Sequence, residues 1–231
     1  MYKNSDIFIA SFHRIEKYLK SKVYNKKEIG FARAVKMLRK SNPIIRRYSD
    51  DLLEFAELRN AIVHNKTDIT YAIAEPHDTV IERMKLIEEE LFRPRTVAQL
   101  FSRKVYCFQQ SENVSRILSF IRNKGFTKFP VYDGQRFKGL ITQKGIAKWL
   151  AMNLEDNRLF SENTILLDIL AYEQEGNYRF VAENTSVYEA DDIFKANTEK
   201  GHRIGALLIT KNGSPSEKLT GIITNYDIMK I

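Results

Sequence analysis

Residues 221–227 read Gly-Ile-Ile-Thr-Asn-Tyr-Asp. A glycine followed by two β-branched residues predicts a short buried strand, and Thr224 and Asn225 stand where that strand would pass into a helix. The backbone N–H groups at such a transition favour an anion. Thr224 adds a hydroxyl donor for a phosphate oxygen, and Asp227 can accept hydrogen bonds from the two hydroxyls of a ribose. This stretch therefore carries the polar groups that a nucleotide needs.

The same pattern occurs earlier in the chain, where residues 139–142 read Gly-Leu-Ile-Thr before another helical pattern. Each copy predicts the order strand, helix, hairpin and helix. Corresponding positions lie 73, 76 and 82 residues apart, for Val114 and Val187, Gly125 and Gly201, and Gly139 and Gly221. The insertions fall at a helix end and in a hairpin, where added residues cost little. We expect one fold in two copies that pack against each other.

The β-α-β-β-α order is accompanied by Phe-Pro-Val-Tyr-Asp at residues 129–133 and by the terminal Gly-h-h-Thr-x-x-Asp, where h is apolar. Together they resemble a tandem pair of CBS domains, the Bateman module. The resemblance covers residues 93–231, with one CBS domain at 93–160 and the other at 161–231. It implies a module that senses AMP, ADP, ATP or another adenosine-containing ligand, with no metal required.

In the second copy the resemblance assigns Thr224 to a phosphate and Asp227 to the ribose. It places the adenine against an apolar strand edge and nearby backbone, formed by Phe180, Val181, Ile204, Gly205 and Ala206. His202 and Arg203 precede that strand. They could contact phosphates, or they could lie on a solvated strand edge.

The first copy departs from this pattern. Thr142 is present, but Gly145 stands at the position of the ribose-binding aspartate. A glycine has no side chain that accepts hydrogen bonds from ribose hydroxyls. We expect this site to be empty or used differently, with Lys144 or Lys148 reaching a neighbouring phosphate, and we expect one strong nucleotide site at Thr224 and Asp227.

Apolar residues recur at helical spacing through the first part of the chain. They predict helices over residues 6–24, from Phe31 to before Asn42-Pro43, over 44–63, and from after Pro76 to 91. Four amphipathic helices with short connections predict a bundle over residues 1–92. The predicted fold class is therefore α+β and multidomain, with an N-terminal all-α helical bundle followed by two β-α-β-β-α CBS repeats.

Arg59-Asn60 and His64 close the third predicted helix. An imidazole can exchange a proton near neutral pH, and a guanidinium can stabilise a phosphorane-like dianion, which are the two roles needed to cleave RNA without a metal. On an ideal helix these two side chains point about 140° apart, so one copy is poorly arranged to act alone. Alternatively, His64 caps the helix and Arg59 pairs with Glu54 or Glu57.

Four helices with an Arg-Asn-x-x-x-His signature resemble the HEPN domains, many of which are ribonucleases that dimerise. The resemblance implies a metal-independent endoribonuclease, with Arg59 and His64 as the catalytic pair and Asn60 beside them, and it implies a homodimer. Other HEPN domains only bind nucleotides or partners. The competing hypothesis is thus a non-enzymatic nucleotide sensor in which the helical domain dimerises or docks a partner.

The composition of the 231 residues, 43% apolar and 29% charged, is that of an ordinary globular protein, and no apolar run is long enough to span a membrane. We expect a cytoplasmic protein. Cys107 is the single cysteine, which excludes a disulfide framework and a zinc site of several thiolates, and it is expected to be a small core residue.

The net charge of +8 is unevenly distributed. Residues 14–47 contain twelve Lys or Arg against two Glu. These are either solvated helix faces or a groove for a polyanion such as RNA, because phosphate neutralisation dominates sequence-independent nucleic-acid binding. A nucleic-acid-binding regulator is a third, weaker hypothesis.

Overall fold

The computed structural model describes residues 3–23, 29–64, 75–153 and 164–230, and for His64 the backbone alone. The chain divides into two compact units, Met1–Arg95 and Thr96–Ile231. Within the described residues, no helix combines the length and the apolar character needed to cross a membrane.

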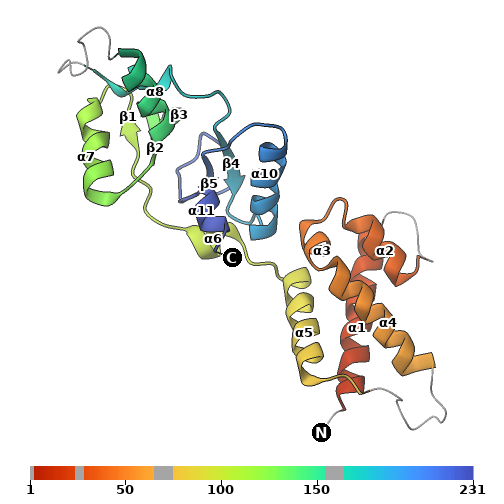
Figure 1. Ribbon diagram of the computed structural model, residues 1–231. Coiled ribbons are helices and arrows are strands. Elements are labelled where there is room, and N and C mark those ends of the chain that lie inside the picture. Colours follow the sequence, from red (N-terminus) through yellow and green to blue (C-terminus); the bar gives the residue numbers. More distant parts are fainter. Residues whose placement is uncertain (1–2, 24–28, 65–74, 154–163, 231) are drawn as a thin grey trace. The chain divides into compact units, whose positions relative to one another are not determined.

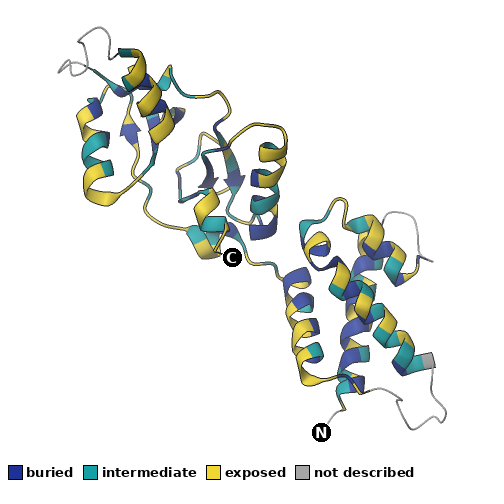
Figure 2. Ribbon diagram, in the orientation of Figure 1, coloured by how far each residue is buried: buried dark blue, intermediate teal, exposed yellow. Residues whose placement is uncertain are grey.

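The first unit is helical (Figure 1), with α1 at Asn4–Lys22, α2 at Phe31–Leu38, α3 at Pro43–Arg47, α4 at Ser49–His64 and α5 at Asp78–Phe92. Helix α1 packs against α2, α4 and α5. Its buried Phe8 and Phe12 lie against Phe55 of α4 and Phe31 of α2, with ring centroids 5.9 and 4.3 Å apart. In Figure 2 the buried residues of α1 and α5 form stripes along these helices. The predicted helical region is confirmed.

The helix predicted over residues 44–63 is wrong in one respect, because it is two helices. Helix α3 ends at Arg47 and α4 begins at Ser49. Between them Tyr48 has φ −105° and ψ 18°, outside the α-helical range. The Tyr48 ring is buried and lies 5.1 Å from the guanidinium of Arg83 on α5, so a tertiary contact favours the bend. Apolar periodicity continues through such a bend and does not reveal it.

The second unit contains the two predicted copies. The first has β1 at Phe108–Gln109, α7 at Val114–Lys124, β2 at Lys128–Asp133, β3 at Arg136–Thr142 and α8 at Gln143–Asn153. The second has β4 at Tyr178–Ala182, α10 at Val187–Glu199, β5 at Ala206–Thr210, β6 at Gly221–Ile223 and α11 at Asn225–Ile228. In both copies the first two strands pair in parallel and the last two antiparallel. The duplicated β-α-β-β-α order and the α+β class are confirmed.

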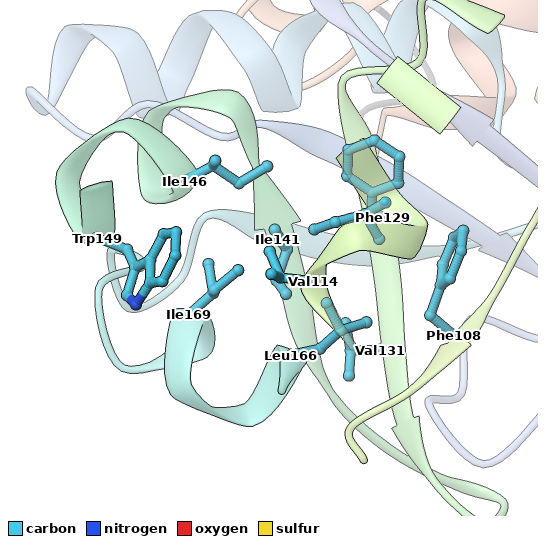
Figure 3. Packing of buried hydrophobic residues seen from close by; sticks show 10 residues of the cluster. Phe108, Val114, Phe129, Val131, Ile141, Ile146, Trp149, Leu166 and Ile169 are labelled. Atoms are coloured by element: carbon cyan, nitrogen blue, oxygen red, sulfur yellow. The ribbon is translucent and has the colours of Figure 1, made fainter. Parts of the chain in front are cut away.

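Each copy places a short helix in the core of the other. Helix α9 at Leu166–Leu170 belongs to the second copy in sequence, but Leu166 and Ile169 pack in the first core with Trp149 (Figure 3). Helix α6 at Val97–Phe101 likewise brings Val97 into the second core, beside Leu207. Backbone bridges between residues 96 and 186 and between 113 and 165 hold these helices. The two copies are therefore interlocked.

A further cluster joins the two sheets. Leu140 of β3 and Leu208 of β5 are buried together. The ring of Phe137 lies 4.9 Å from that of Tyr178 and 5.0 Å from that of Phe180. The copies thus bury their sheet faces against each other, as the duplication predicts.

The expected core position of Cys107 is wrong, because this residue is exposed. Strand β1 begins only at Phe108, whose side chain is buried, and Cys107 lies before the strand. An apolar run in the sequence does not distinguish a strand residue from the segment that leads into it.

Replacing Leu166 with alanine tests whether α9, which follows the first copy in sequence, packs in the core of that first copy. Leu166 is fully buried in the first core, so Leu166→Ala is expected to lower the free energy of unfolding by about 2–5 kcal/mol. Denaturant unfolding followed by the fluorescence of Trp149, the only tryptophan, measures this core. Leu167→Ala, at the exposed neighbour, is the control and is expected to change stability by less than about 0.5 kcal/mol. Equal effects of both variants would contradict the described packing.

Candidate functional site

Thr224 and Asp227 bond to each other where β6 passes into α11. The backbone N–H and the hydroxyl of Thr224 donate to Asp227 Oδ2 over 2.8 and 2.7 Å. Gly221 at the start of β6 is required by close packing, since a Cβ there would lie 2.6 Å from the carbonyl oxygen of Phe101. The sequence therefore brings the two predicted polar residues together, and their mutual hydrogen bonds orient the carboxylate.

Arg103 is a third member of this group. Its guanidinium donates to the carbonyl oxygen of Ile222 over 2.9 Å and lies 3.5 Å from Asp227 Oδ2. Its backbone N–H donates to the carbonyl oxygen of Thr220. Sequence reasoning missed Arg103, because it stands more than a hundred residues before the motif and belongs to the segment between α6 and β1.

A cavity of about 240 Å³ opens beside Asp227. Its wall combines cationic, apolar and hydroxyl groups, from Arg103, Lys104, Val105, Tyr106, Gly125, Phe126, Thr127, Lys128, Phe129, Ile222, Thr224 and Asp227. The rings of Tyr106 and Phe126 are partly exposed and lie 5.6 Å apart. We call this space the Asp227 cavity. It brings together a carboxylate, cations and aromatic faces, which suit a ribose, a phosphate and a base.

In the first copy a different residue supplies the carboxylate. The backbone N–H of Thr142 donates to Glu173 Oε1, and the Thr142 hydroxyl donates to Glu173 Oε2 over 3.1 Å. The N–H of Gly145 donates to the Thr142 hydroxyl. A Cβ on Gly145 would lie 1.9 Å from Glu173 Oε1, so any other residue there would displace this carboxylate from its place beside Thr142. Glu173 therefore accepts the N–H and hydroxyl bonds of Thr142 as Asp227 accepts those of Thr224, although Glu173 lies outside the repeated motif.

The carboxylate of Glu173 is held on both oxygens. Besides the bonds from Thr142, the side-chain amide of buried Asn177 donates to Oε2 over 2.8 Å and to the carbonyl oxygen of Leu140 over 3.0 Å. Burial raises the pKa of Glu173, while the donors Thr142 and Asn177 and the charge of Lys128 oppose that rise. Burial lowers the pKa of Lys128, against the charge of Glu173. Sequence reasoning missed Glu173 and Asn177, since both lie more than 30 residues beyond Thr142.

A second cavity, of about 360 Å³, lies beside Glu173. Its wall is rich in cationic and polar groups, from Thr127, Lys128, Thr142, Lys144, Gly145, Lys148, Tyr172, Glu173, Gln174, Asn177, Arg203, Ile204, Gly205, Thr224, Asn225 and Tyr226. We call this space the Glu173 cavity. Thr127, Lys128 and Thr224 line both cavities.

The predicted nucleotide-site residues fall into three groups, which line the Asp227 cavity, the Glu173 cavity, or neither of them. Thr224 and Asp227 line the Asp227 cavity, whereas Thr142, Arg203, Ile204 and Gly205 line the Glu173 cavity. The remaining predicted residues line neither of these two cavities. Phe180 packs against Phe137, Val181 and Ala206 are buried in cores, and His202 is exposed. The structure thus does not bring the predicted adenine contacts of the second copy together with Asp227.

In the helical unit, Arg59 and Asn60 lie in the last turns of α4, and the Arg59 guanidinium donates to Asn60 Oδ1 over 3.3 Å. The side chain of His64 lies outside the described residues. In the basic stretch, Arg14 pairs with Glu88 of α5 and Lys20 with Glu16. Part of that stretch therefore contacts acidic residues of its own unit. Among the described residues, no three His, Cys, Asp or Glu side chains gather as a possible metal site.

Residues 97–152 and 176–231 match the model of the CBS domain. Among solved structures, a protein with CBS domains from Burkholderia ambifaria is 23% identical, with a TM-score of 0.44, covering 58% of this chain and 91% of its own. A CBS domain-containing protein from Kribbella flavida is 11% identical, with a TM-score of 0.45 and coverage of 58% and 95%. A CBS domain pair solved with 5′-methylthioadenosine and S-adenosyl-L-methionine is 17% identical, with a TM-score of 0.44 and coverage of 59% and 94%. The comparison with curated proteins found no match.

Because a side chain at position 145 would displace Glu173, removing the Glu173 carboxylate is expected to offset the destabilising effect of Gly145→Asp. Gly145→Asp alone is expected to destabilise the unit, because its Cβ would push the Glu173 carboxylate away from the bonds it accepts from Thr142 and Asn177. Combined with Glu173→Ala, the same change is expected to cost less, since the new aspartate can accept the Thr142 bonds as Asp227 accepts those of Thr224. A double-mutant cycle measured by Trp149 fluorescence should give a coupling energy of about 1–3 kcal/mol. The control pairs Gly145→Asp with Glu175→Ala, at an exposed neighbour. A rescue by Glu175→Ala, or none by Glu173→Ala, would contradict this relation.

Proposed function

The second unit contains a tandem pair of CBS domains, and on this premise we propose that it senses an adenine nucleotide, AMP, ADP or ATP, bound in the Asp227 cavity. One observation carries the proposal: Asp227, Thr224 and Arg103 converge on a cavity that also has aromatic walls. CBS pairs commonly take adenosine-containing ligands, which agrees with this chemistry.

The ribose is assigned to Asp227. The hydrogen bonds that Asp227 accepts from Thr224 go to Oδ2, and a carboxylate offers about four acceptor positions. Oδ1 is thus the acceptor for the ribose hydroxyls. Arg103, Lys104 and Lys128 line the same cavity and supply positive charge for phosphates. The faces of Tyr106 and Phe126 provide apolar area for the adenine.

The bound nucleotide would regulate the helical unit. Regulation requires the nucleotide to bind two states of the protein with different affinity, since equal affinity shifts no equilibrium. In a non-enzymatic version the helical unit dimerises or docks a partner, and Arg59 and His64 have no catalytic role.

The enzymatic version is a metal-independent ribonuclease, with Arg59, Asn60 and His64 as its catalytic group. Arg59 and Asn60 lie in the last turns of α4, and the sequence signature that they share with His64 is the support for this version. His64 would exchange the proton of the attacking 2′-hydroxyl and Arg59 would stabilise the phosphate. A homodimer would bring two such groups together.

Nucleotide binding is tested by calorimetric titration with AMP, ADP and ATP. Asp227→Ala is expected to weaken binding at least tenfold, because a hydrogen bond to a charged group contributes about 1.5–3 kcal/mol. Asp168→Ala is the matched control, since Asp168 accepts the backbone N–H of Ile165 at the start of α9 as Asp227 accepts that of Thr224, and Asp168 lines neither cavity. Undiminished binding by Asp227→Ala, or an equal loss in both variants, would refute the assignment of the ribose.

Ribonuclease activity is tested on single-stranded RNA in the presence of a chelator, with and without each nucleotide. His64→Ala is expected to reduce cleavage by about 10²–10⁴-fold, the usual contribution of a general acid or base. His13→Ala, at an exposed histidine of α1, is the control and should cleave normally. Cleavage that survives in His64→Ala would remove the enzymatic version, and no cleavage by the unaltered protein would favour the non-enzymatic one.

A further inference from the structure

The Glu173 cavity has more positive charge than its own residues neutralise. Lys128, Lys144, Lys148 and Arg203 line it, against the single carboxylate of Glu173. In the part of the chain that the structure describes, no carboxylate lies within ion-pair distance of Lys144, Lys148 or Arg203. The cavity therefore attracts an anion, and a cavity with several cations favours one of multiple charge.

The same cavity is poorly suited to a ribose. Glu173 accepts protein hydrogen bonds on both oxygens, from Thr142 on Oε1 and from Thr142 and Asn177 on Oε2. Asp227, in contrast, accepts its bonds from Thr224 and Arg103 on Oδ2. Gly145, at the place of Asp227 in the first copy, has no side chain to accept a hydroxyl. Both oxygens of Glu173 thus already accept bonds from the protein, which leaves fewer acceptor positions for a ribose diol than Asp227 Oδ1 offers.

We propose that the Glu173 cavity binds a compact phosphate-type polyanion without a ribose, of which inorganic pyrophosphate is the simplest probe. Arg203 can make a forked contact to phosphate oxygens, and Lys144 and Lys148, one helical turn apart on α8, supply two point charges. Glu173 acts as the specificity-determining residue, because it fills the position that would otherwise select a nucleoside. The chain then has two cavities for different ligand classes, one for a nucleotide and one for a bare polyanion.

Calorimetric titration of the full chain with pyrophosphate, without divalent metal, tests this assignment. We expect saturable binding, weakened at least tenfold by Lys144→Gln combined with Lys148→Gln. Lys211→Gln combined with Lys218→Gln removes the same charge from exposed positions that line neither cavity, and it should leave binding unchanged. Absence of saturable binding, or an equal loss in the control pair, would overturn the proposal.

Asp227→Ala separates this proposal from the proposed function. It is expected to lose nucleotide binding and to retain pyrophosphate binding, because Asp227 does not line the Glu173 cavity. If pyrophosphate binding disappears in Asp227→Ala, the anion lies in the Asp227 cavity and the present assignment is wrong. If pyrophosphate binds as expected while no nucleotide binds to the unaltered protein, only the proposed function fails.

The role of Glu173 has a converse test, which rests on the proposed function. Gly145→Asp combined with Glu173→Ala is expected to raise the number of AMP molecules bound per chain from one to two. The far-ultraviolet circular dichroism of this variant checks that it is folded. A folded variant that still binds one AMP would overturn the role of Glu173 as the residue that excludes ribose.

Discussion

The C-terminal unit depends on one interaction that occurs twice, a carboxylate that accepts the N–H and the hydroxyl of a threonine at a strand-to-helix junction. In the second copy Asp227 supplies it from three residues beyond Thr224. In the first copy Glu173 supplies it from 31 residues beyond Thr142. The local acceptor keeps an oxygen available on the cavity, whereas the distant one is bound on both oxygens. This single difference makes two pseudo-equivalent cavities chemically unlike.

The exchange of short helices fixes where these cavities lie. Because α6 packs in the second core and α9 in the first, the segment after each of them is carried to the junction of the other copy. Arg103, just after α6, thereby reaches Asp227, and Glu173, just after α9, reaches Thr142. Packing of Val97 and Leu166 thus positions charged groups that no local sequence pattern connects with the motifs.

Much of this architecture could be predicted from the sequence. The repeated Gly-h-h-Thr pattern and the periodicity of apolar residues predicted the duplicated fold and the helical region, because these depend on neighbours in the chain. The hydrogen bond from the Thr224 hydroxyl to Asp227 was not predicted, since that hydroxyl was expected to donate to a phosphate. Arg103 and Glu173 could not be predicted, since their roles depend on the exchange of helices. The bend at Tyr48 and the exposure of Cys107 were missed because tertiary contacts and strand ends decide them.

The central claim is that a nucleotide binds beside Asp227 and not beside Glu173. Hydrogen–deuterium exchange of the backbone with and without saturating AMP tests it most directly, because residues 103–106 line only the Asp227 cavity, whereas residues 172–174 and 203–205 line only the Glu173 cavity. The account predicts slower exchange at 103–106, with little change at 172–177 and 203–205. Slower exchange confined to residues 172–177 and 203–205 would contradict it.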